Sequence, residues 1–134
     1  MKHYLLDTSA LLTLRDDEPG AEEVARILLQ AEVDKVKVFG CFMTLMEIYY
    51  RVWKDENEIE GKLAYAQCQS LPITWIHEST ELLEQAARIK ANYRLSLADA
   101  WIAASAILQE ACLIHKDPEF KTLDLVKQKS LPYK

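Results

Sequence analysis

The sequence predicts an α/β fold, in which helices cover both faces of a central parallel sheet to give a three-layer α/β/α sandwich. Short apolar segments that favour strands alternate along the chain with longer segments of helical periodicity, a pattern typical of strand–helix–strand units. Right-handed crossovers in such units leave the strands parallel. In addition, residues 97–110 are apolar around nearly the whole helical circumference, which indicates a helix buried against the sheet.

The first two elements meet at Asp7. Leu5 and Leu6 end a short buried strand, and the chain turns into a helix directly after Asp7. A second helix is expected at 21–32, where apolar residues recur at helical spacing, and a second strand at 36–42. The first strand therefore delivers a carboxylate at its carboxyl end.

The elements after the second strand follow the same alternation. A helix that begins near Thr44 has one apolar stripe, and helical periodicity resumes over 59–71 after a polar break. Pro72 ends this segment, so 73–76 is expected to form a third strand. The remaining expected elements are a helix at 80–93, the apolar helix at 97–110, a fourth strand at 111–114 and a short edge strand at 131–133, where proline is tolerated.

Size and composition indicate one folded domain covering residues 1–134. A chain of 15.4 kDa buries roughly 70% of its unfolded surface, enough to fold without disulfides. No apolar run reaches the roughly 20 residues that span a bilayer, and the first residues lack the pattern of a signal peptide. The three cysteines are odd in number and set in apolar sequence, so we expect reduced thiols in a cytoplasmic protein without a membrane anchor.

The net charge of −5 argues against a nucleic-acid binder that relies on a broad basic face, but it does not exclude a nuclease. Clustered carboxylates that recruit divalent cations would account for much of the excess, and phosphate contact would then fall to a few local cations. With only three glycines, the chain has no glycine-rich phosphate loop. The candidate cations are Arg15, Arg51, Lys54, Lys90, Arg94 and Lys116.

Four acids lie at or near a junction between an apolar segment and a loop or helix start: Asp7, Glu47, Asp99 and Asp117. Each also has a local explanation. Asp7 suits a helix N-cap, and Glu47 and Asp99 each complete a capping box, three residues after a threonine or a serine. Asp117 precedes a proline and suits the start of a turn. These local roles alone would need no metal ion.

The predicted topology gives the four acids a second interpretation. Asp7 and Asp117 follow strands and Glu47 begins the helix after a strand, so a parallel sheet brings these three to one edge. Asp99 joins them if its helix runs antiparallel to the strands, as crossover packing requires. Two carboxylates about 4 Å apart repel by roughly 4 kcal/mol at an effective dielectric near 20, so a cation is needed among them. Oxygen ligands alone favour Mg²⁺ or Mn²⁺ and phosphodiester chemistry.

The sequence around these acids resembles the PIN domain family, and more narrowly the VapC-type ribonuclease toxins of prokaryotic toxin–antitoxin pairs. The resemblance covers almost the entire chain. It rests on Leu6-Asp7-Thr8-Ser9, on Thr44-Leu45-Met46-Glu47-Ile48 and on Leu95-Ser96-Leu97-Ala98-Asp99-Ala100, with Asp117 in the place of the fourth acid. It implies a PIN-like sandwich and a Mg²⁺- or Mn²⁺-dependent endoribonuclease that leaves 5′-phosphate and 3′-hydroxyl ends. By the same resemblance, Asp7, Glu47, Asp99 and Asp117 would hold the ions and act in catalysis, while Ser9 would orient ligands or water.

The resemblance also implies partners: an RNA substrate, a second copy of the chain in a homodimer, and a cognate antitoxin whose tail covers the acidic groove. Tyr49, Tyr50 and Trp53 give one helix more aromatic surface than a core face needs, which agrees with an interface. Core packing is the alternative explanation for Tyr49 and Trp53.

The last motif departs from the family pattern. His115 stands two residues before the fourth acid, where the family often has threonine or serine. Glu119 is a further acid in the same loop, and it would either share or replace the role of Asp117 or be solvated.

Two other classes of function remain open. A non-catalytic PIN-like module for RNA binding or protein interaction, in which the acids only cap helices, would bind no catalytic ion. A phosphotransfer domain is disfavoured, because Asp7-Thr8-Ser9 lacks the second acid of an Asp-x-Asp nucleophile motif.

Overall fold

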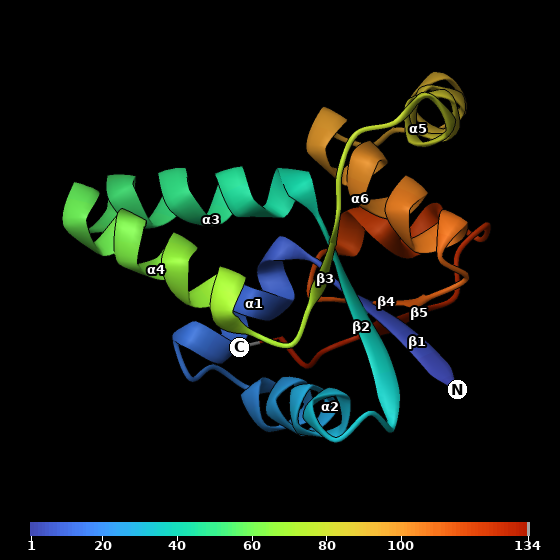
Figure 1. Cartoon of the computed structure of the whole chain (residues 1–134). Coiled ribbons are helices and arrows are strands. Elements are labelled where there is room, and N and C mark those ends of the chain that lie inside the picture. The colour runs from blue at the N-terminus through green and yellow to red at the C-terminus, as the bar shows by residue number, and fades with distance from the viewer. Residues whose placement is uncertain (134) are drawn as a thin grey trace.

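The computed structural model describes residues 1–133, in which strands and helices alternate as the sequence predicts (Figure 1). The strands are β1 (Lys2–Leu6), β2 (Val36–Cys41), β3 (Thr74–Ile76), β4 (Cys112–His115) and β5 (Gln128–Ser130). The α-helices are α1 (Thr8–Arg15), α2 (Ala21–Glu32), α3 (Phe42–Asp55), α4 (Glu58–Ser70), α5 (Thr80–Asn92) and α6 (Leu97–Leu108), and a 3₁₀ helix, η1, spans Pro118–Thr122.

The five strands form one parallel sheet in the order β3-β2-β1-β4-β5. β1 lies at the centre, with Tyr4 opposite Val38 of β2 and opposite Cys112 of β4. The carboxyl ends of β1 and β4 are therefore neighbours, since Leu6 pairs with Ile114. This arrangement confirms the predicted parallel sheet and brings the loops after both strands to one edge of the molecule.

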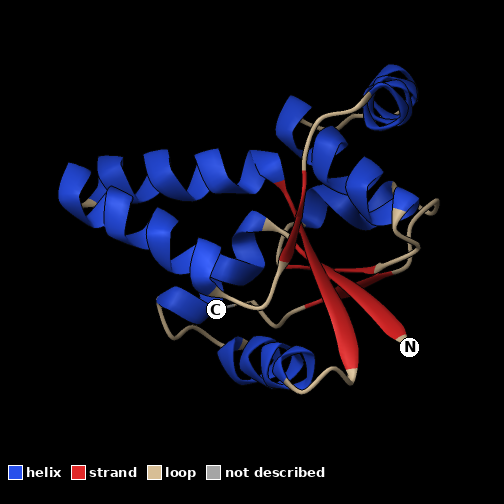
Figure 2. Cartoon of the chain, viewed as in Figure 1, coloured by secondary structure: helices blue, strands red, loops and turns tan. Residues whose placement is uncertain are grey.

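Two apolar cores cover the two faces of the sheet. Figure 2 shows the red strands of the sheet between blue helices. Successive residues of a strand point to opposite faces, so Leu5 belongs to the core under α5 and α6, whereas Leu6 belongs to the core under α1 to α4. Leu113 and Ile114 divide between the cores in the same way. The three-layer α/β/α prediction is confirmed.

α3 begins earlier than the sequence predicted. The helix starts at Phe42, directly after β2, with Cys41 at the N-cap and no side-chain capping bond. Thr44 lies inside the first turn and is buried, so the capping box predicted for Thr44 and Glu47 is wrong. The hydroxyl of Thr44 instead lies 3.1 Å from that of Thr8. Glu47 has no capping role, so its carboxylate can face the edge of the sheet.

The C-terminal edge strand was also misplaced by the prediction. It comprises Gln128–Ser130 rather than 131–133 and pairs with β4 through Ser130 and His115. Leu131 adds one more hydrogen bond, from its N–H to the carbonyl of His115 at 2.7 Å. Pro132 has no N–H to donate, which ends the ladder there.

No helix within residues 1–133 is long and apolar enough to cross a bilayer. The three cysteines are free thiols, with Cys41 and Cys68 buried and Cys112 half-buried.

Candidate metal centre

All four predicted acids line one cavity of about 490 Å³ at the carboxyl edge of the sheet. They arrive from different elements: Asp7 from the end of β1, Glu47 from α3, Asp99 from α6 and Asp117 from the loop after β4. The complete lining is Asp7, Thr8, Ser9, Glu47, Arg51, Ser96, Asp99, Lys116, Asp117, Pro118 and Glu119.

Asp7 combines its local role with a place in the cavity. It is the N-cap of α1, where its Oδ1 accepts a hydrogen bond from the N–H of Ala10 at 2.8 Å. The side chain is only 2% exposed. Burial raises the pKa of Asp7 to about 7; the nearby Asp117 and Glu47 carboxyls add to the rise, and the Ser9 and Ala10 hydrogen bonds oppose it. The capping role and the cavity role therefore coexist.

Ser9 joins two sides of the cavity through its hydroxyl. The hydroxyl donates to the carboxylate of Asp7, at 2.7 and 2.8 Å from the two oxygens. It also accepts from the backbone N–H of Lys116 at 2.8 Å. The start of α1 is thereby tied to the loop between β4 and η1.

Glu47 lies in the second turn of α3 and is half-buried. Its Oε1 accepts a hydrogen bond from the hydroxyl of Thr8 at 2.6 Å. The two residues are 39 positions apart in the sequence. The sequence shows that Thr8 places a hydroxyl beside Asp7, but it does not show that this hydroxyl donates to Glu47.

The first turn of α6, which contains Asp99, is capped in an unexpected way. Ser96 is the N-cap, and its hydroxyl accepts from the N–H of Asp99 at 3.1 Å, which forms half of the predicted capping box. The other half comes from Glu119, whose Oε1 accepts from the N–H of Ser96 at 2.5 Å. Because Glu119 takes that position, the carboxyl group of Asp99 is free to face the cavity.

Asp99, Asp117 and Glu119 form the tightest group of acids in the cavity. One oxygen of each lies within 4.8 Å of the other two, a spacing that suits a shared metal ion. Burial and the neighbouring Glu119 and Asp117 carboxyls raise the pKa of Asp99 well above its ordinary value. The sequence left the role of Glu119 open, and no local signal could have resolved it, because its bond to Ser96 spans 23 residues.

Five acids line the cavity: Asp7, Glu47, Asp99, Asp117 and Glu119. No lysine or arginine among residues 1–133 forms an ion pair with any of them. Lys116 and Arg51 line the cavity, but the ammonium group of Lys116 pairs with Glu18 instead. The negative charge of the cavity therefore lacks a paired side-chain cation, which is the condition that a bound divalent ion relieves.

His115 is buried and fixes the backbone beside Asp117. The N–H of Asp117 donates to Nδ1 of His115 at 3.1 Å. Nε2 then carries the proton and lies 2.9 Å from the Oε1 of Gln128. The amide nitrogen of Gln128 donates in turn to the carbonyls of Phe120 and Leu123. Burial lowers the pKa of His115, which keeps the ring neutral. The His115 ring thus connects the backbone at Asp117 to Gln128 in β5.

Replacing His115 with leucine is expected to lower Mn²⁺ affinity by about tenfold or more, the usual effect of removing a group that orients a metal ligand. The backbone N–H of Asp117 would lose its acceptor and the loop its anchor. Isothermal titration with Mn²⁺ measures the change. His115→Asn, which keeps an acceptor near Nδ1, should lose less, and the exposed His77→Leu serves as control. Wild-type affinity in His115→Leu would contradict this role.

The fold and the cavity together define a class of protein, an α/β/α domain with an acid cluster at the carboxyl edge of its parallel sheet. The chain belongs to the PIN domain family, whose family model matches residues 4–125. A search of curated protein sequences gives no significant match.

Solved structures of similar fold include toxin–antitoxin proteins. VapBC2 from Rickettsia felis, bound to a DNA fragment from its promoter, has a TM-score of 0.77 at 17% identity, with 97% of this chain and 99% of that chain covered. A toxin–antitoxin complex from Klebsiella pneumoniae has a TM-score of 0.65 at 25% identity, with 92% and 94% covered. VapC20 from Mycobacterium tuberculosis, described as a sarcin–ricin loop cleaving toxin, has a TM-score of 0.70 at 16% identity, with 92% and 97% covered.

Proposed function

We propose that this protein is a divalent-metal-dependent endoribonuclease that hydrolyses RNA phosphodiester bonds, and that it is the toxin of a type II toxin–antitoxin pair. The observation that carries the proposal is one cavity that holds Asp7, Glu47, Asp99 and Asp117 without a paired side-chain cation. Membership of the PIN domain family supports it, as does the likeness in fold to a toxin described as cleaving the sarcin–ricin loop.

The donor set of the cavity fits Mg²⁺ or Mn²⁺. The group of Asp99, Asp117 and Glu119 offers three carboxylate oxygens within 4.8 Å of one another, and Asp7 and Glu47 line the same cavity. Carboxylate ligands suit hard divalent cations, whereas none of the residues that line this cavity in the described chain, 1–133, is a histidine or cysteine that would favour zinc. We assign the ion to Asp7, Glu47, Asp99 and Asp117, with Glu119 as an additional ligand.

When bound, a divalent cation activates water and neutralises charge on the phosphodiester. The protein side chains prepare the site for that chemistry. Ser9 orients the carboxylate of Asp7, and Thr8 orients that of Glu47. Before the ion binds, the raised pKa of Asp99 keeps a proton on its carboxyl group, and that proton must leave as the ion enters.

The proposal extends to partners and location. We propose a cognate antitoxin, a homodimer and a cytoplasmic location, on the likeness in fold to VapBC assemblies. Exposed aromatic side chains on α3 agree with a protein interface, because Tyr50 is 41% and Trp53 46% exposed. Tyr49 is half-buried instead, and its ring packs against the rings of Trp53 and Tyr65.

Light scattering on the purified chain should give a mass near twice 15.4 kDa. A monomeric mass would contradict the proposed homodimer.

The function is tested with single-stranded RNA and the purified protein. We expect endonucleolytic cleavage with Mg²⁺ or Mn²⁺, complete loss of cleavage in EDTA, and recovery when the metal ion is restored. The ends of the products should be 5′-phosphates and 3′-hydroxyls. Cleavage that persists in EDTA would refute metal dependence. RNA binding without cleavage under any divalent ion would favour the non-catalytic module instead.

A further inference from the structure

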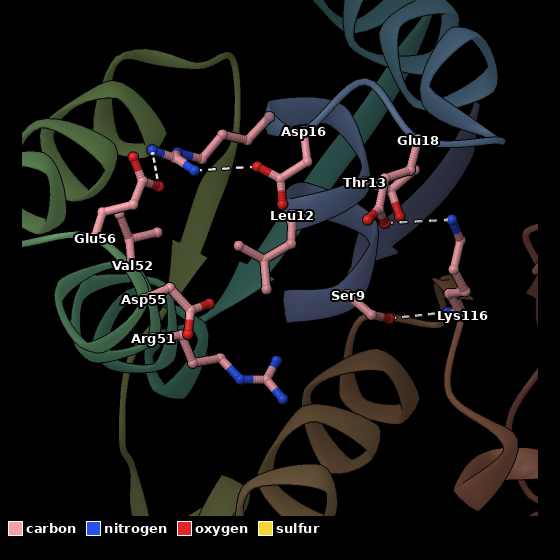
Figure 3. A pocket seen from close by; sticks show the side chains of 11 residues that line it. Ser9, Leu12, Thr13, Asp16, Glu18, Arg51, Val52, Asp55, Glu56 and Lys116 are labelled. Carbon is pink, nitrogen blue, oxygen red and sulfur yellow. Dashed lines mark hydrogen bonds and ion pairs between the residues drawn. The ribbon is translucent and has the colours of Figure 1, made fainter. Parts of the chain in front are cut away.

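The acid cavity continues into a second hollow of about 360 Å³, seen from close by in Figure 3. Ser9, Arg51 and Lys116 line both spaces, so the two spaces meet at these residues. The second hollow lies between α1 and α3 and combines apolar with polar side chains. Its lining is Ser9, Leu12, Thr13, Arg15, Asp16, Glu18, Arg51, Val52, Asp55, Glu56 and Lys116.

Two of the three cations in this region already have partners. The ammonium group of Lys116 lies 2.7 Å from the carbonyl of Pro19 and 3.7 Å from Glu18. The guanidinium of Arg15 lies 3.0 Å from Asp16 and 2.9 Å from Glu56. Both cations are therefore held by the protein itself.

Arg51 is different. It is exposed, and within residues 1–133 no hydrogen bond or ion pair engages its guanidinium, which Figure 3 draws without a dashed line. It stands one helical turn after Glu47 on α3, so both side chains lie on the same face of the helix. Of the six cations considered from the sequence, only Arg51 and Lys116 line the acid cavity. Arg51 is thus the uncommitted cation at the junction.

An uncommitted guanidinium beside an acid cluster suits a polyanion that must approach that cluster. Carboxylates repel phosphate, whereas the planar guanidinium binds phosphate oxygens through two parallel hydrogen bonds. The second hollow also carries Asp16, Asp55 and Glu56. Arg15 lines it too, but its guanidinium is already paired with Asp16 and Glu56, so the hollow is unsuited to a further phosphate. It does suit a nucleoside, because Leu12 and Val52 line it with apolar side chains. Asp55 pairs with no cation among residues 1–133 and can accept a hydrogen bond from a ribose or base group.

We propose that Arg51 binds the RNA phosphate adjacent to the scissile one, and that the second hollow receives the nucleoside attached to it. The inference rests on the proposed ribonuclease function and names the path of the single-stranded RNA out of the acid cavity. Arg51 is a substrate-positioning residue in this arrangement and contributes no metal ligand.

Arg51→Ala tests the proposal, with Arg51→Lys as the conservative variant and Lys54→Ala, a neighbouring cation that lines neither space, as the matched control. We expect Arg51→Ala to raise the KM for single-stranded RNA about tenfold, with kcat changed by less than about threefold and Mn²⁺ affinity unchanged. A lost phosphate contact should also reduce the slope of log affinity against log salt by about 0.7. Arg51→Lys should retain most of the salt slope but only part of the affinity, and Lys54→Ala should match the wild type.

RNA binding by fluorescence anisotropy, with Ca²⁺ in place of Mg²⁺, separates this proposal from the proposed function. If the salt dependence of RNA binding depends on Arg51 but the protein never cleaves RNA, the Arg51 proposal stands and the proposed ribonuclease function is refuted. If Arg51→Ala cleaves RNA normally, with an unchanged KM and an unchanged slope of log affinity against log salt, the Arg51 proposal is overturned and the proposed ribonuclease function stands. The Arg51 proposal also fails if Lys54→Ala has the same effect, if Arg51→Ala weakens Mn²⁺ binding, or if the wild type binds no RNA.

Discussion

Asp99→Asn is expected to reduce metal-dependent RNA cleavage by about 10³-fold or more, because it removes a buried carboxylate from the closest acid group of the cavity. A loss of this size corresponds to about 4 kcal/mol of transition-state stabilisation. The same substitution should stabilise the metal-free protein by about 1 to 3 kcal/mol at pH 8, since a neutral amide replaces a buried carboxyl whose pKa is raised. Cleavage rates with Mn²⁺ and urea unfolding in EDTA measure the two effects.

Asp124→Asn is the matched control, because Asp124 is exposed and lines none of the acid cavity. It should leave both cleavage and stability near wild type. The opposite signs in Asp99→Asn, less activity with more stability, separate a functional acid from a structural one. If Asp99→Asn cleaved RNA within tenfold of the wild-type rate, or if it destabilised the metal-free protein, the assigned role of Asp99 would be wrong.

The second large effect concerns pH. In EDTA, the free energy of unfolding is expected to fall as the pH rises from about 5 to 7. The pKa of Asp7 is about 7 in the folded state, against 3.8 for the ordinary group, so over this range the folded protein keeps a proton that the unfolded chain releases. Stability from this group is complete below the unfolded pKa and is lost as the pH approaches 7, by about 1.4 kcal/mol per pH unit. Asp99 continues the trend at higher pH.

Divalent ions should remove this pH dependence, because they bind the deprotonated carboxylates. At a metal concentration 100 times Kd, linkage predicts about 2.7 kcal/mol of stabilisation, or a Tm rise of about 10 °C for a domain of this size. The rise should be larger at pH 8 than at pH 5 and small in Asp99→Asn. Thermal scans with EDTA or Mn²⁺ at several pH values provide the test. A Tm that increases with pH in EDTA over this range would contradict the assignment.

A separate group sets the acid limit of stability. Arg26 and Lys129 hydrogen-bond to Glu23 and lower its pKa to about 2. This contribution is present above the ordinary pKa of a glutamate and disappears as the pH falls toward 2, opposite in sign to that of Asp7. The metal-free protein should therefore be most stable between about pH 4 and 5.

Much of the fold could be predicted because the strands and helices have strong local patterns. The ends of β1 and β4 fixed the edge on which Asp7 and Asp117 lie, and the crossover of α6 brought Asp99 back to that edge. These placements follow from parallel topology, which depends on the order of elements and not on individual contacts.

The details of the site could not be predicted, because they depend on pairs of residues that are distant in sequence. Glu119 completes the cap at Ser96, and Gln128 holds His115. The start of α3 was misplaced because a capping box at Thr44 is a plausible local signal, whereas the structure continues the helix back to Phe42. Hydrogen bonds between residues far apart in the sequence decided the first two cases.

The two acids of the cavity that come last in the sequence have a consequence for how the protein is made. Asp117 lies in the loop after β4 and Glu119 in η1, and β4 is held between β1 and β5. A nascent chain on the ribosome therefore lacks part of the acid centre until β4 and η1 have emerged. Translation that stops before β4 yields fragments in which the centre cannot assemble, so the complete site arises only on chains that extend through η1.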